Sequence, residues 1–127
     1  MLKKPKAFRL GSLAHRNSPK QEDRAAKKIG GRKTPGSGSG YQKADARRRG
    51  LVRIECKCTS ADSFRVTKKD LDKLDAAVHG TTEIPIMEIE FLLQGRWVGA
   101  LTKRKKVYVV SSEAMDDLLE RLTNAAP

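Results

Sequence analysis

Three charged residues, Asp45, Glu55 and Lys57, have the types and the spacing that metal-assisted hydrolysis of a phosphodiester requires. Carboxylate oxygens bind hard divalent cations, and a bound cation activates the attacking water. The backbone carbonyl of Cys56 offers a third oxygen ligand. Lys57 follows Glu55 by two residues, so in a strand both side chains project from one face. There the lysine can polarise water or stabilise negative charge on the phosphate.

A fourth acid, Glu22, occupies an unusual position in a predicted helix. It shares one helical stripe with Ala25, Ala26 and Ile29. A carboxylate beside an apolar stripe is costly to bury unless a metal, a cation or hydrogen bonds satisfy it. We therefore expect Glu22 to join Asp45 at the metal site. The alternative is that Glu22 has no role at a metal site and is simply an acid near the start of a helix, where the helix dipole stabilises its charge.

The helix that must position Glu22 has marked ends. Its signals are Ser18 as the N-cap, Pro19 at the first helical position, Gln21 in a capping box, and Gly30 with Gly31 at the end. Residues 1–17 are basic and show no sustained apolar period, so we expect a flexible arm there. Residues 18–127 should form a single domain that carries the hydrolytic site.

Asp45 and Glu55 should lie on two neighbouring strands between Lys43 and Thr59, joined by a turn near Gly50. Alternation along the second strand separates two faces, with Val52, Ile54, Cys56 and Cys58 on one and Arg53, Glu55, Lys57 and Thr59 on the other. The first face is small and apolar, so we expect it to pack on the core with both cysteines as buried thiols. The second face carries the chemistry.

The rest of the sequence predicts further helices and strands. A second helix should run from a cap at Thr67 to Gly80, and a strand from Ile84 to Leu93. The expected remainder is a turn at Gln94–Gly95, strands at 97–101 and 107–110, and a helix from Ser111 or Ser112 that buries Met115, Leu118, Leu119 and Leu122. This order of elements predicts an α/β fold, a mixed central sheet flanked by helices.

The charge of the chain is distributed unevenly. Its formal net charge is +12, yet residues 51–127 carry 12 basic and 12 acidic side chains, so the excess lies in the first 50 residues. Such a basic segment favours a polyanion, most simply nucleic acid, because each cation placed against a phosphate releases counterions. The predicted contacts to the DNA backbone are Arg32, Lys33, Lys43, Arg47, Arg48 and Arg49. The alternatives are a solubilising tail and a patch for anionic membranes.

Other chemistry is less well supported by the residues present. A zinc site built from Cys56, Cys58 and the two histidines is disfavoured, because both sulfurs would point to the core and the usual ligand spacing is lacking. The segment Lys103–Lys106 fits a solvated turn and a DNA-contacting hairpin equally well. A non-catalytic DNA-binding module, in which the acids only balance a basic surface, is the main alternative to an enzyme.

The chain contains Asp45, a gap of nine residues and then Glu55-Cys56-Lys57. This arrangement resembles the PD-(D/E)XK signature of the restriction-endonuclease-like superfamily, with Ala44 in place of the proline. In this chain, Glu22 is followed by Gly36-Ser37-Gly38-Ser39 and then by Asp45 and Glu55. Within that superfamily, this series of residues is similar to archaeal-type and phage-encoded Holliday junction resolvases. The resemblance covers roughly residues 18–91 and implies the restriction-endonuclease-like form of the mixed sheet.

The resemblance implies a magnesium-dependent endonuclease that acts on branched DNA as a homodimer. Its catalytic residues would be Glu22, Asp45, Glu55 and Lys57, with Ser37 or Ser39 contributing from the glycine-rich loop. Thr59, the polar residue after the lysine, would bind the DNA. The same hard oxygen ligands also accept Mn²⁺. Nicking and restriction-type nucleases remain alternatives, because this fold can cut several DNA substrates.

No stretch of the sequence approaches the roughly 18 apolar residues that a membrane span needs. Two cysteines separated by one residue are too close for an ordinary disulfide, which favours a reducing compartment. We therefore expect a cytoplasmic protein that does not enter a membrane.

Overall fold

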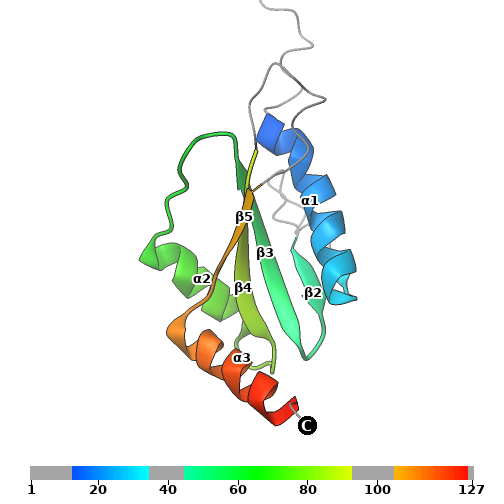
Figure 1. Ribbon diagram of the computed structural model, residues 1–127, viewed down its shortest axis with the longest axis vertical. Coiled ribbons are helices and arrows are strands. Elements are labelled where there is room, and N and C mark those ends of the chain that lie inside the picture. The colour runs from blue at the N-terminus through cyan, green and yellow to red at the C-terminus, as the bar shows by residue number, and fades with distance from the viewer. Residues whose placement is uncertain (1–12, 35–44, 93–104, 126–127) are drawn as a thin grey trace, which may run out of the picture.

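The computed structural model describes residues 13–34, 45–92 and 105–125, and the side chains from residue 17 onward within these ranges. They form an α/β fold with a mixed sheet, as the sequence predicts (Figure 1). The elements are α1 (Leu13–Ile29), β1 (Arg32–Lys33), β2 (Ala46–Arg48), β3 (Val52–Thr59), α2 (Lys68–Val78), β4 (Ile84–Phe91), β5 (Lys105–Val109) and α3 (Ser112–Ala125).

The five strands of the sheet follow the order β1-β2-β3-β4-β5. All neighbours are antiparallel except β3 and β4, which run parallel and are connected through α2. A parallel connection needs such a crossover element, since a short turn can join antiparallel strands only. The turn between β2 and β3 contains Gly50 at a φ of 78°, a left-handed conformation that glycine adopts without strain.

The two faces of the sheet pack against different helices (Figure 1). On one face, Ala25 and Ala26 of α1 cover Val52 and Ile54 of β3. On the other, Leu74 of α2 packs on the β4 residues of the second core cluster, Met87 and Ile89. The sheet separates these clusters, so residues of β3 alternate between the α1 side and the α2 side.

Helix α2 begins and ends close to where the sequence predicts. The hydroxyl of Thr67 accepts a hydrogen bond from the Asp70 amide at 3.2 Å, and the Asp70 carboxylate accepts one from the Thr67 amide at 2.9 Å. This capping box satisfies two amides that the first turn of a helix leaves unpaired. The expected strand from Ile84 is also confirmed, since β4 begins at that residue.

The predicted start of the first helix at Ser18 is wrong. Helix α1 begins at Leu13 and contains Pro19 in its interior, so residues 13–17 are helical and do not belong to the expected arm. Gln21 does not close a capping box; it is fully buried and its Nε2 donates to the Lys57 carbonyl at 2.9 Å. Contacts to the sheet therefore extend the helix past its local start signals, although a proline removes one helical hydrogen bond.

The predicted buried face of the last helix is also wrong. Met115, Leu119 and Leu122 are 43%, 53% and 66% exposed. The helix instead turns Ala114, which is buried, toward the sheet, and the guanidinium of Arg121 donates to the Thr82 carbonyl at 2.7 Å. Helix α3 contacts only the end of the sheet, so a narrow stripe of its surface is enough to make this contact. Most of its leucine side chains therefore remain exposed to solvent.

The predicted strand at residues 107–110 corresponds to β5, which starts earlier, at Lys105. The turn at Gln94–Gly95, the strand at 97–101 and residues 103 and 104 of the basic segment lie outside the described residues, whereas Lys105 and Lys106 belong to β5. No helix within the described ranges is long and apolar enough to cross a membrane.

Candidate active site

The pairing of β2 with β3 brings Asp45 next to Glu55. Ala46, the first residue of β2, is paired with Ile54, so the residue before it lies beside the residue after Ile54. Thr34 fixes this point of the chain, because its amide donates to the Asp45 carbonyl at 2.7 Å and its hydroxyl accepts from the Asp45 amide at 3.0 Å. The two carboxylates thus come from neighbouring strands, as the sequence predicts.

The Asp45 carboxylate is buried and only half satisfied. Its side chain is 12% exposed, and Oδ2 lies 3.5 Å from Nη2 of Arg53. The other oxygen, Oδ1, is buried and has no hydrogen-bond partner among the described residues. Burial, and then the negative charge of Glu55, raise the pKa of Asp45 to about 6 despite the opposing charges of Arg53 and Lys57. A cation with room for oxygen ligands would relieve this unsatisfied charge.

Glu55 and Lys57 project from the same face of β3, which confirms the predicted alternation of this strand. Lys57 Nζ lies 3.4 Å from Glu55 Oε1, and their side chains are 24% and 15% exposed. Lys57 also lowers the pKa of Asp45, so its ammonium acts on both acids. Asp45, Glu55 and Lys57 therefore form one electrostatic unit, whereas their metal-binding and catalytic roles stay predictions.

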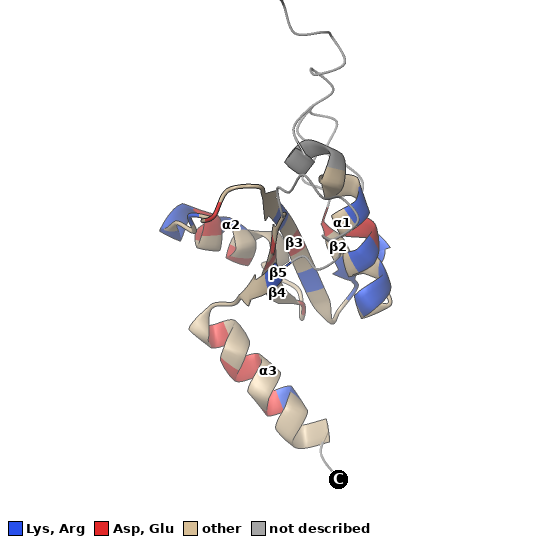
Figure 2. Cartoon of the chain, turned by 45° about the horizontal axis from the view of Figure 1, so that its top comes forward, with Lys and Arg blue, Asp and Glu red and all other residues tan. Residues whose placement is uncertain are grey.

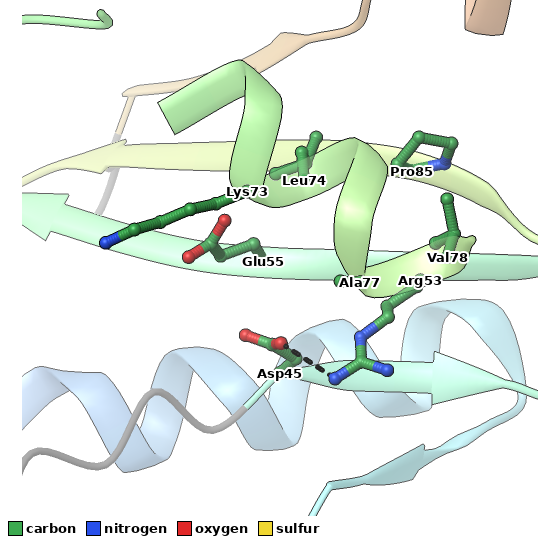
Figure 3. Close-up of a pocket in the computed structure, with 8 residues that line it drawn as sticks. All are labelled: Asp45, Arg53, Glu55, Lys73, Leu74, Ala77, Val78 and Pro85. Atoms are coloured by element: carbon green, nitrogen blue, oxygen red, sulfur yellow. Dashed lines mark hydrogen bonds and ion pairs between the residues drawn. The ribbon is translucent and has the colours of Figure 1, made fainter. Parts of the chain in front are cut away.

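A cavity of about 150 Å³ opens between this unit and helix α2. Its polar lining comes from the two carboxylates and from Arg53 and Lys73, and its apolar lining from Leu74, Ala77, Val78 and Pro85. In Figure 3, Arg53 reaches Asp45 from β3, and Lys73 extends from α2 past Glu55. Sequence reasoning missed Lys73, because a lysine on a helix has no local feature that distinguishes it from a solvated one.

Glu22 lies on the α1 side of the sheet. It is 5% exposed, as expected for an acid on the inward stripe, and its Oε1 is 4.0 Å from Lys33 Nζ. Burial raises the pKa of the Cys56 thiol, and Glu88, Glu22 and Asp45 raise it further, so Glu22 and Asp45 both act on this thiol. Among the described residues, no group of three acidic, histidine or cysteine side chains is arranged to hold a metal.

The other predicted site residues have mixed outcomes. Ser37, Ser39 and Lys43 lie outside the described residues, so their roles stay predictions. Thr59 ends β3, where its hydroxyl accepts from the Ala61 amide at 3.0 Å and closes the turn after the strand. Cys56 and Cys58 form no disulfide in the described part of the chain and are only half-buried, which is less than the sequence analysis expects.

Most of the predicted DNA-binding cations surround one basic cavity. It has a volume of about 490 Å³, and its cationic lining residues are Arg32, Lys33, Arg47, Arg48 and Arg49. Arg47 differs from the others, because Glu83 holds its guanidinium through contacts of 2.6 and 2.8 Å. Arg32, Arg48 and Arg49 are exposed. Figure 2 shows basic residues along the outer side of α1, whereas the acids of α3 lie apart from them.

Two buried acids of β4 escaped the sequence analysis. Glu90 is fully buried, and its Oε1 accepts from Arg24 Nη2 at 2.6 Å and from Asn17 Nδ2 at 2.9 Å. Glu88 is 1% exposed and accepts from Gln21 Nε2 at 3.2 Å. Both acids alternate with apolar residues in β4, a pattern that resembles a strand with one solvated face. Here the polar face lies under α1, which supplies matching polar side chains.

No protein-family model, curated protein or solved structure matches the chain. The resemblance of the candidate site to that of a nuclease rests on its motif residues alone.

Proposed function

We propose that this chain is a metal-dependent DNA endonuclease of the restriction-endonuclease-like kind, with Asp45, Glu55 and Lys57 as the core of its active site. The observation that carries the proposal is the state of Asp45. Its carboxylate is buried beside a second carboxylate, one of its oxygens has no hydrogen-bond partner among the described residues, and a cavity opens next to it. Paired acids in this condition favour a divalent cation.

The donor set of the site fits Mg²⁺. Asp45 and Glu55 provide hard carboxylate oxygens, and the carbonyl of Cys56 is the proposed third ligand. Glu22, on the α1 side, is proposed as an outer acid of the same site. Bound Mg²⁺ would supply an activated water and neutralise charge on the phosphate.

The residues of the chain have separate tasks in this proposal. Lys57 donates hydrogen bonds from its ammonium to the attacking water or to the developing negative charge on the phosphate. Its contact of 3.4 Å with Glu55 also holds that carboxylate in place. Ser37 or Ser39 is proposed to assist at the phosphate.

The DNA partner follows from the basic cavity at β1 and β2. Arg32, Arg48 and Arg49 are exposed there, so they can approach phosphates without breaking an internal ion pair of the kind that holds Arg47. Such contacts position a backbone and carry no base sequence. Together with the resemblance to junction resolvases, this supports branched DNA as the substrate and a homodimer that cuts two strands.

A non-catalytic DNA-binding protein is the second candidate, favoured by the same basic cavity. A cleavage panel separates the two functions. Four-way junction, flap, nicked and plain duplex DNA are incubated with the protein and Mg²⁺, with EDTA as the control. We expect products from the junction that disappear in EDTA. Retarded but uncut DNA on all four substrates would favour the binding protein. Cys56 and Cys58 are not joined in a disulfide, which suits a cytoplasmic enzyme.

A further inference from the structure

Two cations, Arg53 and Lys73, line the cavity that holds the proposed catalytic acids. Arg53 belongs to β3 and lies two residues before Glu55, so both side chains project from the same face. Lys73 comes from α2, on the opposite wall of the cavity. Figure 3 shows both side chains beside the carboxylates of Asp45 and Glu55.

Arg53 is partly committed to Asp45 but retains donors for a ligand. Its side chain is 24% exposed, and a single contact of 3.5 Å joins its Nη2 to Asp45. Its Nε is buried and has no hydrogen-bond partner among the described residues. A buried guanidinium nitrogen without an acceptor is costly, and a planar guanidinium can donate two parallel hydrogen bonds to a phosphate.

Lys73 is placed by the packing of its neighbour. Leu74 is 5% exposed in the core under α2, and the Thr67 capping box fixes the start of this helix. The position of the Lys73 backbone is therefore set by rigid elements. Its ammonium forms no ion pair within the described part of the chain, although Glu55 and Asp45 line the same cavity.

The charges of the cavity are suited to one phosphodiester. Asp45 and Glu55 together carry two negative charges, which a divalent cation would balance. A phosphodiester adds one further negative charge beside them, and Lys57 is already paired with Glu55. Arg53 and Lys73 are the two cations that line the cavity. The other wall of the cavity is apolar and consists of Leu74, Ala77, Val78 and Pro85.

We propose that Arg53 and Lys73 form a binding site for the phosphate group that is to be cleaved, and hold its non-bridging oxygens beside Asp45 and Glu55. This inference rests on the proposed nuclease function for the identity of the reaction. It adds that α2, as well as the basic cavity at β1 and β2, contacts the DNA backbone.

Lys73→Met tests the proposal with little risk to folding, because Lys73 is exposed. Lys69→Met is the matched control, since Lys69 is an exposed lysine of the same helix that does not line the cavity. With four-way junction DNA and Mg²⁺, we expect Lys73→Met to raise KM about tenfold while kcat changes less than about threefold. The KM of Lys69→Met should stay close to that of the unmodified protein.

Arg53 is tested by a pair of variants. Arg53→Lys keeps the positive charge but loses the planar pair of donors, whereas Arg53→Gln loses the charge as well. We expect KM to rise for both, and more for Arg53→Gln. Equal KM values for the unmodified protein, Lys73→Met and Arg53→Lys would overturn the phosphate-binding site.

A binding measurement keeps this inference separable from the proposed function. Junction affinity is measured against salt concentration in Ca²⁺. Loss of one phosphate contact should make the slope of log affinity against log salt shallower by about 0.9 for Lys73→Met, but not for Lys69→Met. If the unmodified protein cuts no DNA but Lys73→Met shows this change, the nuclease proposal fails and the phosphate site stands. Identical slopes for both variants would overturn the phosphate site even if the protein is a nuclease.

Discussion

Oδ2 of Asp45 lies 3.5 Å from Nη2 of Arg53, while Oδ1 of the same carboxylate is buried with no hydrogen-bond partner in the part of the chain that the structure describes. The single contact with Arg53 does not offset the loss of hydration and the negative charge of Glu55. The pKa of Asp45 is therefore raised to about 6. The buried Asp45 carboxylate therefore lowers the stability of the folded chain, as polar groups at functional sites often do.

The first prediction concerns stability against pH. The pKa of Asp45 is about 6 in the folded protein and 3.8 as the ordinary value, so the folded state binds more protons between these limits. Stability from this group should be highest below pH 3.8 and should fall as pH rises through 6, by up to about 3 kcal/mol. Urea unfolding at a series of pH values in EDTA measures this change.

Asp45→Asn should remove this pH dependence, because asparagine does not ionise. Asp116→Asn, at an exposed position of α3, is the matched control and should retain it. The interpretation of Asp45 is wrong if both variants lose stability with rising pH to the same extent as the unmodified protein.

The second prediction concerns Gly31, which lies against β2. A Cβ atom at this position would come within 2.2 Å of the Arg47 carbonyl oxygen, a backbone atom that cannot turn aside. Gly31→Ala should therefore push β1 away from β2 and lower the free energy of unfolding by at least about 2 kcal/mol. Because the basic cavity spans both strands, DNA affinity should fall with it.

Gly80→Ala is the control for Gly31→Ala. Gly80 has a φ of 78°, but a Cβ there would meet nothing within 4 Å. The substitution should cost about 1 kcal/mol through backbone strain and leave DNA affinity unchanged. Thermal unfolding and gel-shift titration measure the two effects. Equal losses of affinity in both variants would show that the β1–β2 contact does not shape the basic cavity.

The third prediction compares two deletions at the N-terminus. Removing residues 1–11 takes away four cations, Lys3, Lys4, Lys6 and Arg9, and leaves α1 intact. The salt dependence of DNA binding should become shallower without loss of stability. Removing residues 1–17 also takes away Asn17, whose amide donates to buried Glu90 at 2.9 Å, so this deletion should lower the unfolding temperature. Unchanged stability of the longer deletion would contradict the structural role of residues 13–17.

The sequence predicts an element of this fold correctly where neighbouring residues alone determine it, and incorrectly where contacts with distant strands determine it. The Thr67 cap and the alternation of β3 are local, and both are confirmed. The start of α1 and the face of α3 depend on contacts with distant strands, and both predictions are wrong. Asn17 and Gln21 read as arm and cap residues in sequence, because their buried partners in β4 and β3 are far along the chain.

The same distinction applies to the site. Glu55 and Lys57 share one strand, and a short turn leads back to Asp45, so spacing alone predicts that they meet. Lys73 reaches the cavity through the crossover helix, which no local pattern reveals. Glu22 is buried as predicted, but it comes from α1, whereas Asp45 lines the cavity beside α2.

The fourth prediction concerns the choice of metal. Ca²⁺ should support DNA binding without cleavage, because it is larger, accepts loose coordination and acidifies bound water less than Mg²⁺. Mn²⁺ should support cleavage, since carboxylate ligands suit it as well. Gel shifts in Ca²⁺ should exceed those in EDTA, with intact DNA. Cleavage restored by Zn²⁺ alone would instead point to Cys56 and Cys58.

The central claim is that Asp45 and Glu55 hold the metal ion at which a phosphodiester of DNA is hydrolysed. The most direct measurement is the single-turnover cleavage rate of four-way junction DNA in Mg²⁺ for Asp45→Asn and Glu55→Gln, with Asp116→Asn as the control and DNA affinity measured in parallel. We expect both site variants to lose cleavage by a factor of about 10³ or more while affinity stays within a few fold, and the control to cut normally. Normal cleavage by Glu55→Gln, or full cleavage by the unmodified protein in EDTA, would contradict the account.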